Sequence, residues 1–394
     1  METTTYKISD IGEVVGGGTP STANSDFWGG DIPWISPKDL TGYKSVYISH
    51  GENFLTKTGL KSGTKLLPKG TVLFSSRAPI GYVAIASNPI CTNQGFKSII
   101  CNKEIINPLF LYYYIKGNLD YIKLFGTGAT FPEISGAAMR KIKVQIPSIP
   151  TQQKISSILS AYDCLIENNT RRIRLLEQMA ENLYKEWFSY RKIKGQSKAV
   201  KLKEIINITR GLSYSSEEID CTDGNNLINL KNIQGYGGFR LDGTKLYKGK
   251  YKPEQIVEEG DLIMGVTDMT QDRRTIGSVA LIPNVNTLSV ISADLVKINS
   301  SIDNTYLYAM FRYGNVSRHI AQFANGANVL HLRPKSILNI KVFLPNQDII
   351  DSFVSKVKPM IQLTNRLNTE IDSLTRQRDL LLPRLMSGKL EVKS

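Results

Sequence analysis

Residues 125–148 read FGTGATFPEISGAAMRKIKVQIPS, and residues 323–346 read FANGANVLHLRPKSILNIKVFLPN. Gly128 in the first stretch corresponds to Gly326 in the second, an offset of 198 residues in a chain of 394. Self-similarity at a fixed period is the signature of a repeated structural unit. The chain is therefore predicted to contain two homologous modules, each taking up about half of its length.

Segments that lie earlier in each half keep the same order. The stretch WISPKDL from Trp34 corresponds to LINLKNI from Leu227, and LPKGTVLFSSRAPIGYVAIA from Leu67 corresponds to VEEGDLIMGVTDMTQDRRTIGSVALI from Val257. Alternating apolar residues predict short strands here, and the stretches NPLFLYYYIKGNL and NTYLYAMFRYGNV predict helices. Each module is therefore expected to be α+β.

A helix with a heptad pattern follows each module. Residues that step alternately by four and three form one seam, as the a and d positions of a coiled coil do. The predicted seam positions are Ile155, Leu159, Tyr162, Ile166, Asn169, Ile173, Leu176, Ala180, Leu183, Trp187, Phe353, Val357, Met360, Thr364, Leu367, Ile371, Leu374, Arg378, Leu381 and Leu385. Two amphipathic helices in one chain can bury each other, so we expect an antiparallel, intramolecular coiled coil. The polar seam residues Asn169 and Thr364 either set its register or are half-exposed.

These patterns predict an α+β fold with the order module, helix, module, helix. The expected boundaries are 1–150 for the first module, 151–190 for the first helix, 191–199 for a linker, 200–346 for the second module, and 347–394 for the second helix with a C-terminal tail. A helix of about 35 residues is roughly 50 Å long. Antiparallel helices of that length would carry the modules to opposite ends, in reach of DNA sites about one helical turn, roughly 34 Å, apart.

The composition indicates a polyanionic partner. Lys and Arg total 49 against 35 Asp and Glu, for a net charge of +14 that is spread along the chain. Nucleic acid is the usual polyanion for a cytoplasmic protein. No segment resembles a signal peptide, and no apolar run approaches the roughly 20 residues of a membrane span. The sequence therefore predicts a cytoplasmic protein without a membrane partner.

Signatures of chemistry are weak. The four cysteines lie far apart and form no C-x-x-C pair, which predicts reduced thiols and neither a disulfide framework nor a zinc site. Asp261, Asp268 and Asp272 would suit a metal-dependent nuclease, but they suit a structural loop equally well. The stretch NPLF at Asn107 lacks the second proline of a DNA adenine methyltransferase motif. We therefore expect no catalytic residue, metal or cofactor in this chain.

The glycines Gly16, Gly17 and Gly18 raise the question of a phosphate-binding loop. Such a loop usually closes with Lys-Ser or Lys-Thr before a helix, and here Thr-Pro-Ser follows instead. The second copy reads TRGLS and keeps a single glycine. We interpret the triplet as a turn at the recognition face that allows close backbone approach to DNA without binding a nucleotide.

Six stretches together resemble one family, the specificity (S) subunits of Type I restriction-modification systems. They are GGGTPSTANSDFWGGDIPWISPKDL, GTVLFSSRAPIGYVAI, NQGFKSI, GTGATFPEIS, IPTQQKI before the first heptad helix, and LLLPRLMSGKLEV near the end of the chain. Each motif alone is weak. Their order, together with the duplication and the helix after each copy, is specific, and the resemblance covers essentially the whole chain.

The resemblance implies a non-catalytic DNA-binding subunit. Its two modules would be target recognition domains, each of which reads one half of a bipartite sequence in double-stranded DNA. The helices would fix the gap and dock two methyltransferase (M) subunits, which carry S-adenosylmethionine and methylate adenine. Restriction (R) subunits, two where they are present, would add translocation and cleavage that use ATP and magnesium.

Residues that would contact DNA are those with paired donors or acceptors for base edges, or with a donor for phosphate. The candidates are Thr19, Ser21, Lys38, Ser76, Arg77, Thr127 and Thr130 in the first module, and Lys231, Asn232, Arg240, Lys245, Thr267, Arg273, Arg274, Asn325 and Asn328 in the second. The Gly-rich, basic and aromatic segment 235–252 is the most suggestive; a solvated hairpin with ordinary lysines is its alternative. Whether Arg273 reads a base or holds a phosphate stays open.

Two other functions remain alternatives. The chain could be a self-contained restriction or modification enzyme with unrecognised catalytic residues, and would then cleave or methylate DNA without added subunits. It could also be a coiled-coil scaffold with basic domains, and would then bind all duplexes with equal affinity at a fixed salt concentration.

Overall fold

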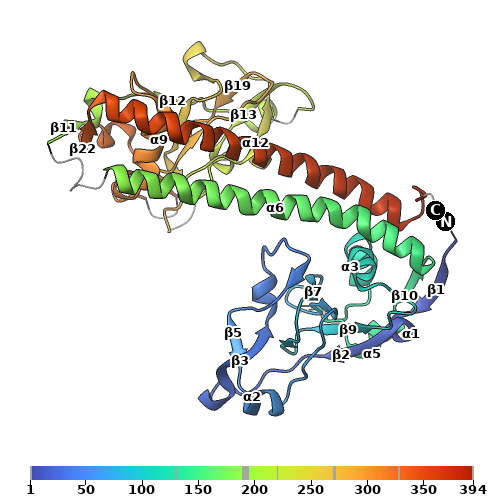
Figure 1. The fold of residues 1–394 in the computed structure, drawn as a ribbon. Helices are drawn as coiled ribbons and strands as arrows, with labels where there is room; N and C mark the ends of the chain where they lie inside the picture. The colour runs from blue at the N-terminus through green and yellow to red at the C-terminus, as the bar shows by residue number, and fades with distance from the viewer. Residues whose placement is uncertain are drawn as a thin grey trace. The chain divides into compact units, whose positions relative to one another are not determined.

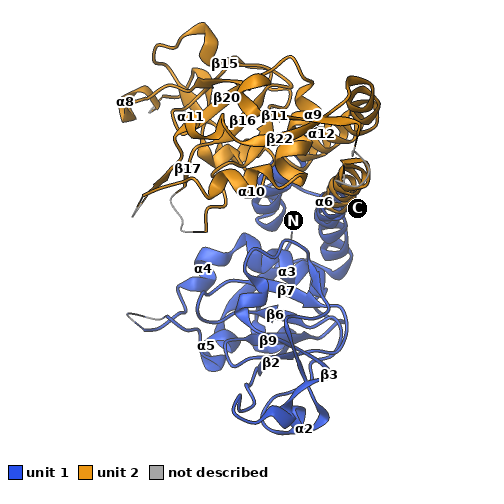
Figure 2. Cartoon of the chain, turned by 90° about the vertical axis from the view of Figure 1, so that its left-hand side faces the viewer, with its two compact units in different colours: residues 1–168, 373–394 blue, residues 169–372 orange. Residues whose placement is uncertain are grey.

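The computed structural model describes residues 2–128, 130, 132–188, 195–219, 221–268, 272–326 and 329–392. The chain forms two compact units, which Figure 2 shows in different colours. Unit 1 contains Met1–Asn168 and Ser373–Ser394, and unit 2 contains Asn169–Asp372. Each unit therefore combines one sequence module with parts of two long helices.

Unit 1 is built on a five-stranded sheet in the order β2-β9-β6-β7-β4 and a three-stranded sheet in the order β5-β3-β8. Its elements are β1 (Thr4–Lys7), α1 (Ile8–Ile11), β2 (Gly12–Gly16), β3 (Trp28–Ile35), β4 (Tyr47–Ile48), β5 (Asn53–Leu55), α2 (Lys57–Lys61), β6 (Val72–Phe74), β7 (Val83–Ala86), β8 (Cys91–Thr92), β9 (Lys97–Cys101), α3 (Pro108–Gly117), α4 (Leu119–Lys123), α5 (Gly136–Lys141) and β10 (Lys143–Ile146). The predicted strands in the GTVLFSS and YVAIA stretches are therefore confirmed.

Unit 2 repeats this plan with two four-stranded sheets, β12-β20-β16-β18 and β14-β13-β19-β15. Its elements are β11 (Ser197–Lys201), β12 (Asn207–Arg210), α8 (Ser216–Ile219), β13 (Asn225–Ile228), β14 (Lys245–Tyr247), β15 (Ile256–Val257), β16 (Leu262–Gly265), β17 (Thr267–Asp268), β18 (Val279–Leu281), β19 (Ser289–Ile291), β20 (Leu295–Asn299), α9 (Asn304–Tyr313), α10 (Val316–Ala321), β21 (Leu330–His331), α11 (Pro334–Ile337) and β22 (Lys341–Pro345). The repeat read from the sequence is thus a repeat of structure.

An antiparallel ribbon closes each module. In unit 1, β1 pairs with β10 and places Tyr6 opposite Val144. In unit 2, β11 pairs with β22 and places Val200 opposite Val342, which corresponds to Val144 by the same offset of 198. Because the ribbon joins the first and last strands of a module, the chain leaves each module directly into a long helix.

These two helices are α6 (Ile149–Phe188) and α12 (Gln347–Met386), the longest in Figure 1. The beginning of α6 packs with the end of α12 in unit 1, where Ile155 and Leu159 share a core with Leu385. The end of α6 packs with the beginning of α12 in unit 2, where Tyr184 shares a core with Val357. The pairing is therefore antiparallel, as predicted.

The burial of the predicted heptad positions is consistent with a seam between the two helices. Every predicted seam position except Arg378 is apolar or a small polar residue, and each of the twenty is buried or half-buried. Leucines off the seam, such as Leu165 and Leu175, are exposed instead. Asn169 is buried, and its amide nitrogen has no hydrogen-bond partner among the described residues. Half-exposure of Asn169 is thus excluded.

All four cysteines are free thiols, in line with the sequence analysis. Burial raises the pKa of the Cys91 thiol to about 11 and that of Cys101 to about 12, so both stay protonated at neutral pH. Cys164 on α6 is exposed. Among the described residues, no helix is long and apolar enough to cross a membrane.

Candidate nucleic-acid interface

Two loops meet at the same place in each module. In unit 1, the hairpin 127–133 is closed by two backbone hydrogen bonds between Thr127 and Glu133, of 3.0 and 2.9 Å. The next amide, Ile134 N–H, donates to the carbonyl of Ser76 in the turn that follows β6. The segments SSRAP and GTGATF, far apart in the sequence, are thereby brought together.

Unit 2 builds the same junction at the corresponding residues. Asn325 and His331, each 198 residues after its counterpart, exchange backbone hydrogen bonds of 3.0 and 2.9 Å. The amide of Leu332, equivalent to Ile134, donates to the carbonyl of Val266 after β16. The frame of the junction is therefore conserved between the two modules.

The side chains at the two junctions differ. In unit 1, the Glu133 carboxylate pairs with Arg77 at 3.5 Å and with Lys97 at 3.3 Å. In unit 2, the position of Glu133 is taken by His331, and the strand pair β17–β21 forms beside it. The segment between β16 and Ile276-Gly277 in unit 2 is also longer than the corresponding segment between β6 and Ile80-Gly81 in unit 1. One scaffold thus presents two different chemical surfaces, which is what two different half-sites require.

Twelve of the candidate residues are exposed or half-exposed, and Arg273 and Arg274 are two of them. The other ten are Thr19, Ser21, Lys38, Arg77, Thr127, Thr130, Lys231, Arg240, Lys245 and Asn325. Several already have a protein partner: Lys38 pairs with Glu52 at 3.0 Å, and Arg240 pairs with Asp242 at 2.5 Å. Pairs as exposed as these are weak, so a DNA phosphate can compete for the cations.

The adjacent arginines Arg273 and Arg274 lie on the longer turn of unit 2. Arg274 pairs with Asp272 at 2.6 Å, and both of these side chains are largely exposed. Arg273 is half-buried and donates to the carbonyl of Ala321 at 3.3 Å. Asn328 lies outside the described residues.

Three candidates are built into the protein interior. The Ser76 hydroxyl is fully buried and donates to the carbonyl of Gly95 at 3.1 Å. The Asn232 amide is fully buried and donates to the carbonyl of Arg240 and to the Thr244 hydroxyl. Thr267 is buried and donates to Asp294 at 2.9 Å. These side chains hold loops in place, and we no longer propose them as direct DNA contacts.

Two residues of the triple glycine pack closely against the protein's own backbone. A Cβ on Gly17 would lie 1.9 Å from the carbonyl oxygen of Asn93, and one on Gly18 would lie 1.9 Å from that of Gly63. The amide of Gly18 donates to the carbonyl of Thr92 at 2.8 Å. Gly17 and Gly18 therefore allow a close backbone approach within the protein, whereas a Cβ on Gly16 would meet nothing within 4 Å. The approach of this turn to DNA stays a prediction.

The segment 235–252 is not a simple hairpin. It contains a 3-10 turn at Leu241–Gly243 followed by β14, which pairs with β13. The Lys245 ammonium lies 5.4 Å from the ring centre of Tyr214, and the Tyr236 ring is exposed. Its exposed cations and aromatic ring keep the segment in the candidate interface.

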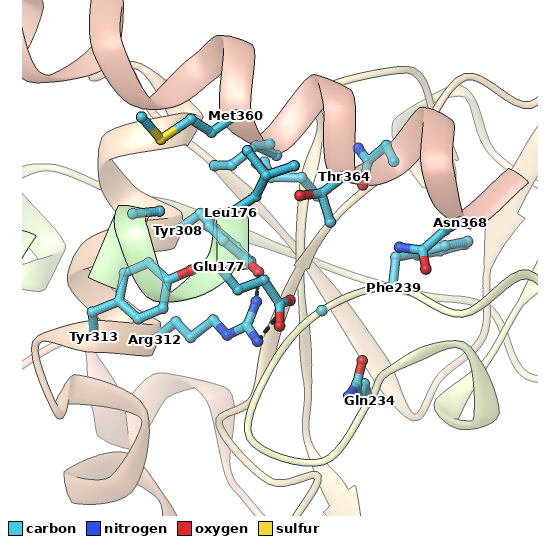
Figure 3. Close-up of a pocket in the computed structure, with 15 residues that line it drawn as sticks. Leu176, Glu177, Gln234, Phe239, Tyr308, Arg312, Tyr313, Met360, Thr364 and Asn368 are labelled. Atoms are coloured by element: carbon cyan, nitrogen blue, oxygen red, sulfur yellow. Dashed lines mark hydrogen bonds and ion pairs between the residues drawn. The ribbon is translucent and has the colours of Figure 1, made fainter. Parts of the chain in front are cut away.

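Arg312 on α9 fixes the second module to the long helix α6. As Figure 3 shows, its guanidinium points at Glu177, and the two side chains form an ion pair of 3.0 Å. The same guanidinium donates to the Tyr308 hydroxyl and lies 5.4 Å from the ring centre of Tyr313. All its main contacts are within the protein, so Arg312 positions the recognition module and is not itself free to bind DNA.

Sequence reasoning missed the ion pair between Glu133 and Lys97 and did not name the exposed cation Arg318. Glu133 and Lys97 belong to stretches that carry the family resemblance, GTGATFPEIS and NQGFKSI. Their opposite charges were the sequence signal that could have predicted an ion pair between these two motifs. Arg318 is an exposed cation on the short helix α10, and no motif surrounds it. Among the described residues, no group of His, Cys, Asp and Glu side chains could hold a metal ion.

The architecture of two similar α+β modules, each leading into one of two antiparallel helices, defines a class of protein, the two-module DNA specificity proteins. The family model for the Type I restriction modification DNA specificity domain matches the chain twice, over residues 1–178 and 195–373. The chain belongs to this family. Membership implies a non-catalytic role in DNA recognition and favours this role over the self-contained enzyme.

Individual relatives agree. The chain is 32% identical over 415 aligned residues to the specificity subunit of the Type I restriction enzyme MjaIX of Methanocaldococcus jannaschii, and the alignment covers 98% of this chain and 93% of the relative. It is 23% identical to the specificity subunit of the Type I restriction enzyme HindI of Haemophilus influenzae, over 83% and 88% of the two chains. The crystal structure of the S subunit from M. genitalium has a similar fold, with a TM-score of 0.67, 15% identity, and coverage of 100% of this chain and 97% of that one.

Proposed function

We propose that this chain is the specificity subunit of a Type I restriction-modification complex, in which each module reads one half of a bipartite target in double-stranded DNA. The observation that carries the proposal is the repeated loop junction. The Thr127–Glu133 and Asn325–His331 bridges have the same geometry, while the side chains around them differ. A shared frame with different donors and acceptors suits the recognition of two unlike half-sites.

In the proposed complex, the chemistry belongs to other subunits. Two M subunits would bind S-adenosylmethionine and methylate adenine, and R subunits, where present, would use ATP and magnesium. The paired helices α6 and α12 would set the gap between the half-sites. The basic character of the chain, with a net charge of +14, supports a place beside DNA in the cytoplasm.

Deletion of the gene should remove one bipartite adenine-methylation motif with a fixed gap from the host genome. The reason is that, without this chain, the M subunits would lack the component that recognises the target DNA sequence. Methylation mapping by single-molecule sequencing of the parent and the deletion strain measures this directly. A methylome that is identical in the two strains, when an M subunit co-purifies with the chain, would contradict the proposal.

The helix pair offers apolar surface for a partner. Leu175 and Met179 lie one turn apart on α6 and are about half exposed, although neither is on the seam. Leu165 on α6 and Leu380 on α12 are exposed as well. Apolar residues kept at the surface of a paired helix are typical of a protein-binding face. We propose that they contact the M subunits.

Met179→Glu should reduce the amount of M subunit retained by the tagged chain at least about ten-fold, because burying an unpaired carboxylate in an interface costs several kcal/mol. Co-purification from cells that express both subunits measures the effect. The neighbouring exposed residue provides a control, since Gln178→Glu adds the same charge one position away. Equal retention by the two variants would place the M-subunit contact elsewhere.

A further inference from the structure

A cavity of about 370 Å³ lies beside the recognition loops of unit 2. Four separate segments line it: the loop at Tyr236, the turn that contains Arg273 and Ser278, the helix α9 at Arg312, and the helix α10 with Ser317 and Arg318. A backbone hydrogen bond joins the loop and the turn, in which the amide of Tyr236 donates to the carbonyl of Arg274 at 2.9 Å. The cavity is therefore preformed by backbone contacts.

The charge that faces this cavity is positive. Among the described residues, Arg273 donates one hydrogen bond, to the carbonyl of Ala321 at 3.3 Å, and most of its N–H donors have no partner there. Arg318 is exposed and makes no ion pair with any described residue. The carboxylate of Asp272, which also lines the cavity, is neutralised by Arg274 at 2.6 Å. Arg312, which also lines the cavity, is paired with Glu177 at 3.0 Å, so Arg273 and Arg318 leave a local surplus of two positive charges that an anion would balance.

The hydroxyl of Ser317 provides an independent indication. Only 8% of this residue is exposed, and its Oγ has no hydrogen-bond partner among the described residues. Buried hydroxyl groups in folded proteins are nearly always hydrogen-bonded, so an orphan that lines a cavity points to a missing ligand. A serine hydroxyl beside arginines is a common donor to phosphate oxygens.

We propose that this cavity seats one phosphate group of the DNA backbone, held by Arg273, Arg318 and the Ser317 hydroxyl. The inference rests on the proposed DNA-recognition function and adds a contact of a different kind from base reading. The three groups donate, and a phosphate accepts at every oxygen, whereas a base edge also presents donors. Arg273, for which the sequence left open a base or a phosphate, is thereby assigned to phosphate.

The test compares two labelled duplexes, one with the mapped bipartite target and one with the same composition scrambled, titrated with the full chain between about 50 and 200 mM salt. Arg318→Gln should weaken binding to both duplexes alike, by about three- to ten-fold at about 100 mM salt, and lower the salt slope by about one. Lys341→Gln, which removes an exposed cation from β22, is the matched control and should change the slope less.

Ser317→Ala separates binding from folding. Loss of a donor to phosphate should weaken both duplexes about five- to ten-fold, while removal of an unpartnered buried hydroxyl should leave the melting temperature unchanged or raise it. A lower melting temperature with unchanged affinity would show a structural role for Ser317. That result, with an unchanged Arg318→Gln variant, would overturn the proposal.

Three further outcomes are informative. If either variant loses affinity for the target duplex only, the cavity reads a base, and the phosphate assignment is wrong. If micromolar inorganic phosphate raises the melting temperature of the wild-type chain but not of Arg318→Gln, the cavity binds a free phosphate ion. The assignment to a phosphate group of the DNA backbone is then wrong. If the wild-type chain binds neither duplex, the proposed function itself fails, a result that is distinct from a defect confined to the variants.

Discussion

Phe353→Ala should lower the free energy of unfolding of unit 2 by about 4 kcal/mol. Phe353 is only 1% exposed and lies near the start of α12. Its ring centre is 4.9 Å from that of Phe188 and 5.9 Å from that of Tyr184, both on α6, and 6.4 Å from that of Tyr306 on α9. Truncation would open a cavity where both long helices and the recognition module meet. The neighbouring aromatic rings pack against one another, so they cannot move into the cavity and fill it.

Hydrogen exchange of peptides from unit 2 is the appropriate measurement, because the two units need not unfold in one step. Backbone amides of α9 and of the first half of α12 should exchange faster in the variant, while those of unit 1 keep their rates. Phe343→Ala is the control, since Phe343 lies on β22 and is about half exposed. Similar losses of protection for the two variants would mean that the aromatic cluster contributes little.

The sequence predicted much of this architecture because the relevant signals are local and periodic. The heptad repeat identified α6 and α12 to within two residues at their starts, Ile149 against 151 and Gln347 against 347. The pairing of the two helices followed from the requirement that two apolar seams bury each other, whereas their antiparallel direction is shown by the shared cores of the structure. The duplication then predicted that the two modules share a common plan, although the sheets differ in strand number, with five and three strands in unit 1 and four and four in unit 2.

The side-chain roles were harder to predict, because periodicity does not say which polar group turns inward. Asn232 has the donors and acceptors of an adenine-reading residue. However, its side-chain oxygen accepts from the backbone N–H of Asn229 at the start of a 3-10 turn, and its side-chain nitrogen donates to the Thr244 hydroxyl. Ser76 likewise bonds to Gly95, nineteen residues later in the chain. Polar residues of a recognition loop and those of a loop frame are alike in composition, and only the tertiary structure separates them.

One seam position carries a charged side chain, and its explanation is also non-local. Arg378 occupies a seam position of α12, and the side chain is only 15% exposed. It donates to Asp163 on α6 at 2.5 Å, and the second oxygen of that carboxylate accepts from the Tyr113 hydroxyl of α3 at 2.6 Å. Asp163 lies 215 residues away in sequence, so no window of the heptad pattern contains both partners. The cluster joins both helices to the module within unit 1.

Arg378→Met should lower the free energy of unfolding of unit 1 by about 3 kcal/mol, because it leaves the Asp163 carboxylate buried without its cation. The Asp163 side chain is 8% exposed, so water cannot replace the lost partner. Burial raises the pKa of the Tyr113 hydroxyl, which therefore remains a protonated donor and still satisfies one carboxylate oxygen. Hydrogen exchange of unit 1 peptides measures the loss, and Arg376→Ala, an exposed arginine of the same helix, should cost less than about 0.5 kcal/mol.

The variant that removes all three polar groups, Tyr113→Phe with Asp163→Leu and Arg378→Met, separates stability from specificity. Replacing a whole buried ionic cluster by apolar residues of similar size is often neutral or stabilising, whereas breaking it is costly. We therefore expect the triple variant to recover most of the stability that Arg378→Met loses. If the triple variant recovers the stability, the charged residues are retained for a reason other than stability. They can fix the register of α6 against α12, because a slip by one helical turn would bury Asp163 against an apolar seam. If the triple variant is as unstable as Arg378→Met, the cluster stabilises unit 1 directly, and the charge at this seam position needs no further explanation.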